Sequence, residues 1–120
     1  MQVRSYRDLV VWQKGMDLAV AVYMLTALFP RSEQFRLVDQ LTRASASIAA
    51  NVAEGHERGT RKDYANFVSI ARGSLAETET FLVLAQRLGY VTTMQVGDAT
   101  ALAEEVSKML NALLTRLRRS

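Results

Sequence analysis

Residues that break regular secondary structure are rare in this 120-residue chain, and their scarcity strongly limits its possible folds. The chain has one proline, Pro30, and six glycines, whereas folds built from many short strands need frequent turn residues. The breakers separate four long stretches in which apolar residues recur every three or four positions, as one face of a helix requires. We therefore predict four helices over residues 8–29, 33–55, 61–88 and 93–118.

The predicted helix ends carry recognisable signals. Asp8 and Ser32 are candidate N-caps for the first two helices. Thr60 and Thr92 stand three residues before Asp63 and Gln95, which is the capping-box spacing. The connecting loops are short, so consecutive helices should be antiparallel. The sequence thus predicts an all-α protein, a single domain over residues 1–120 folded as an antiparallel up-down-up-down four-helix bundle.

The first predicted helix carries more apolar surface than a bundle interior needs. One apolar stripe on this helix comprises Leu9, Trp12, Met16, Ala19 and Tyr23. A second stripe includes Val11, Leu18, Val22 and Leu25. Either the helix is deeply buried within its own bundle, or the second stripe faces another copy of the chain. We favour the second interpretation, which makes these last four residues the candidate oligomer interface.

Several classes of function lack the residues they need. The chain has no cysteine, which excludes disulfides and thiol chemistry. Its one histidine, His56, has no glutamate three positions before it, unlike the ligand motif of di-metal bundles. The apolar run over residues 18–29 is too short to span a bilayer, and the N-terminus does not resemble a signal peptide. We expect a cytoplasmic, non-enzymatic protein that uses no metal or cofactor and does not enter membranes.

Positive charge is concentrated at one end of the predicted bundle. The formal net charge is only +3, but in an up-down-up-down arrangement eight basic residues should gather at one pole against four acidic ones. We call them the basic pole: Arg4, Arg7, Arg58, Arg61, Lys62, Arg116, Arg118 and Arg119. The last three are equally explained as complements to a helix dipole. A pole of this charge favours contact with the phosphate backbone of RNA or DNA, without base stacking, since the aromatic residues are expected in the core.

Longer stretches of the sequence resemble a known family. The segments are residues 6–13, Phe29-Pro30, residues 41–55, residues 71–80 and residues 88–90. They are similar to the bacterial four-helix-bundle proteins encoded within 23S rRNA intervening sequences. The signature segment includes Arg43, Asn51, Glu54 and Gly55, with Val52 where the family has isoleucine.

The resemblance implies an all-α fold and a ring-shaped homopentamer, and it extends to the accessory proteins of diversity-generating retroelements. It implies no established activity and no catalytic residue. Within the signature, we predict that Arg43 pairs across helices with Glu77 or Glu79, and that the other three residues end a helix or form a ligand site. Two functions remain open: a homo-oligomer that binds RNA or DNA through the basic pole, or a structural scaffold that binds other proteins and no nucleic acid.

Overall fold

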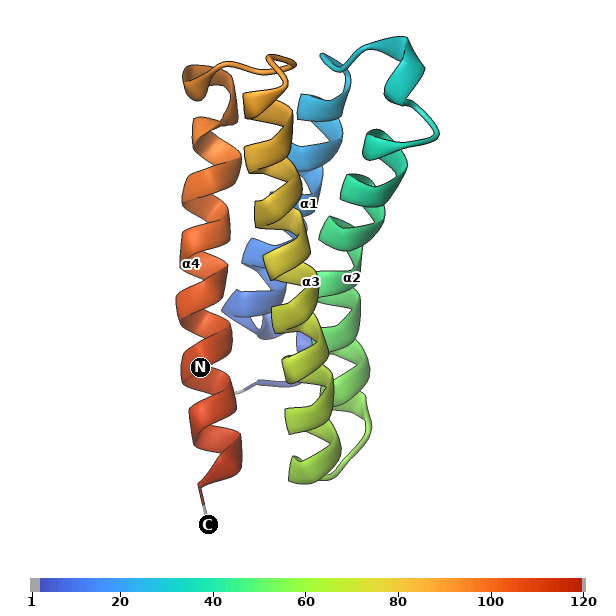
Figure 1. The fold of residues 1–120 in the computed structure, drawn as a ribbon. Helices are drawn as coiled ribbons and strands as arrows, with labels where there is room; N and C mark the ends of the chain where they lie inside the picture. Colours follow the sequence, from blue (N-terminus) through green and yellow to red (C-terminus); the bar gives the residue numbers. More distant parts are fainter. Residues whose placement is uncertain (1–2, 120) are drawn as a thin grey trace.

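The computed structural model describes residues 3–119 and shows an antiparallel four-helix bundle (Figure 1). Each helix packs against two neighbours, so that within these residues α1 is diagonal to α3, and α2 to α4. The bundle measures 46 by 24 by 22 Å, and none of its helices is both long and apolar enough to cross a membrane. The predicted fold class is confirmed. The helices are α1 (Val10–Thr26), α2 (Leu37–Glu57), α3 (Arg61–Arg87) and α4 (Thr93–Arg118), with two 3-10 turns, η1 (Tyr6–Asp8) and η2 (Arg31–Glu33).

The ends of α3 and α4 follow local sequence signals. The hydroxyl of Thr60 accepts a hydrogen bond from the Asp63 amide at 3.1 Å. Thr92 and Gln95 form the reciprocal capping box, with bonds of 2.9 and 3.1 Å. Gly89 closes α3 with φ of +78°, a conformation that glycine adopts without the steric cost of a side chain.

The first two helices are shorter than predicted. Ser5, not Asp8, is the first cap, and it caps the turn η1 before α1 begins at Val10. After Thr26, the amides of residues 27–29 each donate a hydrogen bond to the backbone carbonyl three residues earlier. The chain therefore turns more tightly than an α-helix before it reaches Pro30. η2 then follows, so α2 begins four residues later than predicted.

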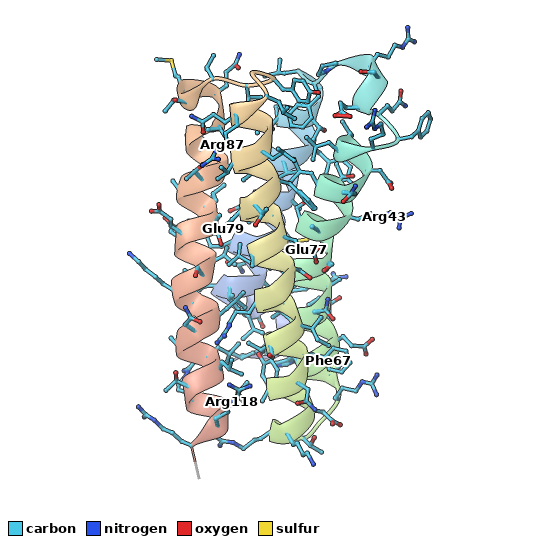
Figure 2. All side chains as sticks on the ribbon, viewed as in Figure 1. Arg43, Phe67, Glu77, Glu79, Arg87 and Arg118 are labelled. Atoms are coloured by element: carbon cyan, nitrogen blue, oxygen red, sulfur yellow. The ribbon has the colours of Figure 1, made fainter. Side chains whose placement is uncertain are left out.

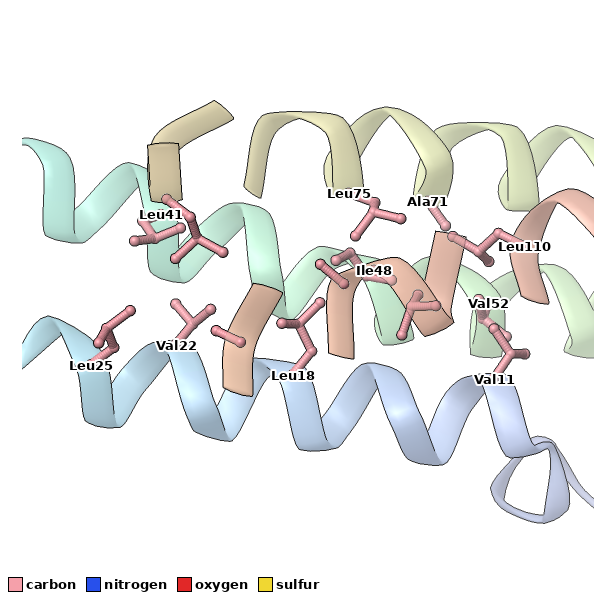
Figure 3. Packing of buried hydrophobic residues seen from close by; sticks show 14 of the residues in the cluster. Val11, Leu18, Val22, Leu25, Leu41, Ile48, Val52, Ala71, Leu75 and Leu110 are labelled. Carbon is pink, nitrogen blue, oxygen red and sulfur yellow. The ribbon is translucent and has the colours of Figure 1, made fainter. Parts of the chain in front are cut away.

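The core is built from one stripe of each helix (Figure 3). The stripe of α1 corrects our prediction. Val11, Leu18, Val22 and Leu25, proposed as an oligomer interface, are at most 8% exposed and lie in the chain's own core. They repeat at spacings of seven, four and three, which keeps them on the side of α1 that faces α2 and α4.

The side of α1 that remains exposed is instead apolar. Val20 and Tyr23 are each 56% exposed and Met24 is 72% exposed. Met16 and Leu28 extend this surface toward the two ends of the helix. We refer to these five residues as the α1 outer face. The excess apolar surface of α1 is therefore on the opposite side from the one predicted.

Candidate nucleic-acid interface

The end of α2, the start of α3 and the end of α4 meet at one end of the bundle (Figure 1). The turn between α2 and α3 is tight because Gly59 adopts φ of +87° and Thr60 caps the next helix. This tight turn therefore keeps three basic residues near one another: Arg58, Arg61 and Lys62. Six of the eight predicted basic residues belong to these three helix ends.

Two of the six are engaged within the chain. Arg58 lies 3.4 Å from a carboxylate oxygen of Glu54, and its guanidinium is 5.0 Å from the centre of the Phe67 ring. Arg61 donates a 2.6 Å hydrogen bond to the backbone carbonyl of Arg116. That carbonyl belongs to the last turn of α4 and also accepts a 3.3 Å hydrogen bond from the Arg119 amide, so Arg61 is its second donor. Arg58 and Arg61 therefore contribute to the stability of this end as well as to its charge.

The other four basic residues have no acidic partner. Lys62, Arg116, Arg118 and Arg119 are exposed, and within residues 3–119 no carboxylate oxygen lies within 4.0 Å of their charged nitrogens. We call these four residues the tip cluster; Figure 2 shows Arg118 near the end of α4. Cations without an acidic partner, placed on neighbouring helix ends, are suited to bind a phosphate backbone.

Arg4 and Arg7 lie apart from the tip cluster. They belong to the segment around η1, which packs against α1 and α2. Figure 1 shows this segment crossing the bundle above the start of α3 and the end of α4. The Arg7 guanidinium is 5.8 Å from the centre of the Tyr6 ring. The predicted basic pole is thus a tip with two further cations on the side of the bundle.

Aromatic and histidine side chains fill the bundle behind the tip. The rings of His56 and Tyr64 meet edge to face, with centroids 5.6 Å apart. Burial raises the pKa of the Tyr64 hydroxyl, and the nearby charge of Arg116 only partly opposes this. The Tyr64 hydroxyl and His56 Nδ1 are buried without a hydrogen-bond partner among the described residues. These partly buried rings pack against one another, so this end offers mainly charge to a partner.

The signature residues have structural roles in α2. Gly55 is buried where α2 crosses α3, and a Cβ atom there would lie 2.7 Å from that of Phe67. The Asn51 amide donates to the backbone carbonyl of Ser47 at 2.7 Å. Glu54 makes the ion pair with Arg58 described above. Gly55 therefore sets how closely α2 and α3 approach one another.

The predicted pairing of Arg43 across helices is wrong. Its Nε lies 3.2 Å from Asp39 Oδ1, one turn earlier on the same helix. Figure 2 shows the Arg43 side chain directed outward, away from Glu77 and Glu79 on α3. The register of α2 against α3 turns position 43 to solvent, which sequence spacing alone did not show.

Acidic and histidine residues do not gather into a metal site. Among residues 3–119 there is no group of three or more His, Cys, Asp or Glu side chains placed to hold an ion. Glu79 is partly buried, and burial together with the nearby charge of Glu104 raises its pKa. These two carboxylates come from neighbouring helices, α3 and α4, and repel one another.

Both the sequence and the fold are similar to those of known proteins. Residues 7–112 match the family described as 23S rRNA-intervening sequence protein. The fold also matches a crystal structure from Bacteroides thetaiotaomicron VPI-5482, described as a protein of unknown function from the S23 ribosomal protein family. The two chains share 28% identity with a TM-score of 0.78, over 87% of this chain and 97% of the other. No curated protein matches the sequence significantly.

Proposed function

This chain belongs to the 23S rRNA-intervening sequence protein family, and we propose that it is a non-catalytic homo-oligomer that binds the phosphate backbone of RNA or DNA through the tip cluster. The observation that carries this proposal is that Lys62, Arg116, Arg118 and Arg119 have no acidic partner within the described part of the chain. Arg116 and Arg118 complement the dipole of α4, but Lys62 lies in the first turn of α3, where a cation interacts unfavourably with the helix dipole. Its position there is better explained by an anionic partner. The lack of cysteine suits a reducing compartment, and we propose the cytoplasm.

Charge of this kind predicts binding with little sequence preference. Phosphate contacts fix position but do not read bases, and the rings of His56 and Tyr64 at this end are partly buried against one another. Each neutralised phosphate contributes a slope of about −0.9 to the logarithmic dependence of affinity on salt. Four contacts per subunit would therefore give a slope of roughly −3 to −4, and an oligomer that aligns several tips would give a steeper one.

Fluorescence anisotropy with labelled RNA and DNA across a salt series tests the proposal. The variant is Lys62→Gln, Arg118→Gln and Arg119→Gln, which lowers the net charge from +3 to 0. The matched control is Arg72→Gln, Arg87→Gln and Lys108→Gln, which makes the same change at exposed positions elsewhere. We expect the first variant to lose most of its affinity and salt dependence while the control keeps both. Equal loss in the two variants would show that only net charge matters and would contradict a specific site.

The exposed apolar surface supports the alternative function. Two exposed apolar features are suited to protein contacts: the α1 outer face, and Phe35 at the other end of the bundle. A wild-type protein that forms oligomers but binds neither RNA nor DNA at low salt would favour a structural scaffold. The tip cluster would then serve only to stabilise the helix ends on which its residues lie.

A further inference from the structure

The loop between α1 and α2 holds a single aromatic side chain in solvent. Phe35 is 87% exposed, although large aromatic residues are usually well buried. The loop that carries it is anchored, because the buried carboxylate of Glu33 accepts a 3.2 Å hydrogen bond from the Tyr90 hydroxyl. Arg36 follows Phe35 directly and lies 3.6 Å from Glu33. Arg31, four positions before Phe35, makes no ion pair among residues 3–119. An exposed aromatic residue beside arginines is the composition of an interface hot spot.

A pocket of about 300 Å³ lies between α1 and α4. Ala21, Met24, Leu25 and Leu28 form its apolar wall, and Asp98 lies among its α4 residues. A cavity of roughly 150 Å³ is enough to hold benzene, so this pocket has room for a phenyl ring. Asp98 makes no ion pair with another described residue.

We propose that Phe35 of one copy inserts into the α1–α4 pocket of a second copy, with Arg31 facing Asp98. The inference rests on the homo-oligomer of the proposed function and identifies the surfaces that form it. Phe35 precedes α2, which is diagonal to α4, so the aromatic residue and the pocket lie on different sides of one bundle.

The occupant is a second copy because that copy supplies both parts of the contact. The phenyl ring matches the apolar wall. Arg31 and Asp98 have opposite charges, and neither forms an ion pair within residues 3–119. The contact joins unlike surfaces, so it is heterologous, and copies added in this way close into a ring when the rotation between them allows it. Met24 and Leu28 belong to both the pocket and the α1 outer face, so part of that apolar surface is covered in the same contact.

Sedimentation velocity of single variants tests the two halves of the contact. Phe35→Ala removes the aromatic residue and Met24→Lys places a cation in the pocket; both side chains are largely exposed, so the monomer fold should persist by circular dichroism. The matched controls are Met94→Ala, 90% exposed, and Ile70→Lys, 51% exposed on α3. We expect each test variant to associate at least about 30-fold more weakly, as loss of a hot spot does. The controls should match wild type.

Mixing the two test variants makes the test specific for this geometry. The Phe35→Ala chain keeps an intact pocket, and the Met24→Lys chain keeps an intact Phe35. Only one contact can therefore form between them, so the mixture should yield a 1:1 heterodimer of two 13.4 kDa chains and nothing larger. Native mass spectrometry of differently tagged chains reads this directly.

The outcomes separate this inference from the proposed function. A wild-type protein that is monomeric at all accessible concentrations contradicts the homo-oligomer itself. A wild-type oligomer that the Phe35→Ala change leaves intact contradicts only the contact proposed here. Two variants that dissociate but fail to form the mixed dimer would overturn the pairing of Phe35 with this pocket.

Discussion

Replacing Gly55 by alanine tests how closely α2 must approach α3. The added Cβ would lie 2.7 Å from the Phe67 Cβ and 3.2 Å from the backbone oxygen of Tyr64. Neither neighbour is the flexible end of a side chain, so the helices must move apart, and such overpacking costs about 1–3 kcal/mol. Alanine regains about 1 kcal/mol through its higher helix propensity. The net loss is about 0–2 kcal/mol, with a midpoint near 1 kcal/mol that corresponds to roughly 4 °C in Tm for a domain of this size.

Gly73→Ala is the matched control, because Gly73 is also inside a helix but has nothing within 4 Å of the added Cβ. There only the propensity gain of about 1 kcal/mol remains, which predicts a Tm about 4 °C higher. Thermal unfolding of both variants, followed by circular dichroism, measures two shifts of opposite sign. A Gly55→Ala protein that melts at or above the wild-type temperature would refute the close-approach argument.

Three further substitutions address single interactions, each measured by thermal unfolding. Tyr64→Phe removes a buried hydroxyl without a partner, so stability should be unchanged or higher by about 1 kcal/mol. Burial raises the pKa of Tyr64 above its ordinary value of 10.0. Wild type should therefore lose stability as the pH rises from 10.0 through the folded-state pKa, and the Tyr64→Phe variant should lose less. Glu79→Gln should stabilise the protein at pH 7, since burial and Glu104 raise the pKa of Glu79, and the difference should vanish below pH 4.5. Thr92→Ala removes the α4 cap at a cost of about 1 kcal/mol, whereas Thr93→Ala should cost less.

The sequence predicted the features that depend on local chemistry. Thr60 and Thr92 cap their helices in the structure, and Thr92 forms the full capping box with Gln95, because such caps need only residues within one turn. The stripe formed by Leu37, Leu41, Ala44, Ile48 and Val52 can be read from the sequence of α2 and is buried in the structure. Most other residues of α2 are small or polar, so only one face is strongly apolar.

The orientation of α1 could not be predicted in the same way. Both of its faces are apolar, so periodicity allowed two rotations about the helix axis, and Met16 and Tyr23 were assigned to the wrong one. Packing against α2 decides between them: Gly15, whose added Cβ would lie 3.4 Å from that of Ala49, lets the two helices approach on that side. The exposure of Phe35 was missed for a related reason, since hydrophobicity alone places an aromatic residue in the core.

The sequence predicted where the basic residues lie in the bundle, but not which of them have partners within the chain. The sequence placed eight basic residues at one pole, yet Arg58 and Arg61 have intramolecular partners, and these depend on the contact between α3 and α4 and on one turn of α2. Arg4 and Arg7 lie on the side of the bundle because η1 folds the N-terminal segment across α1 and α2. Of the eight predicted residues, tertiary packing thus leaves four at the tip of the bundle without an acidic partner among residues 3–119.

The two proposals together make a prediction that neither makes alone. If the Phe35 contact builds a ring, every copy is related by one rotation axis, so all tip clusters point in the same direction along that axis. A long RNA that reaches several tips then binds with an affinity raised by effective concentration, whereas a short RNA that reaches one tip does not. Phe35→Ala removes no charge and leaves the tip cluster intact.

We therefore expect Phe35→Ala to weaken binding of a long RNA by about 10²-fold or more and to leave binding of a short RNA unchanged. Anisotropy with the two lengths, at one salt concentration and with Met94→Ala as the control, measures both. Equal affinity of wild type and Phe35→Ala for the long RNA would mean that each subunit binds independently, and the oligomer would then have no part in nucleic-acid binding. Equal loss for both lengths would instead place Phe35 in direct contact with RNA, because only a shared local contact affects a ligand too short to reach a second tip.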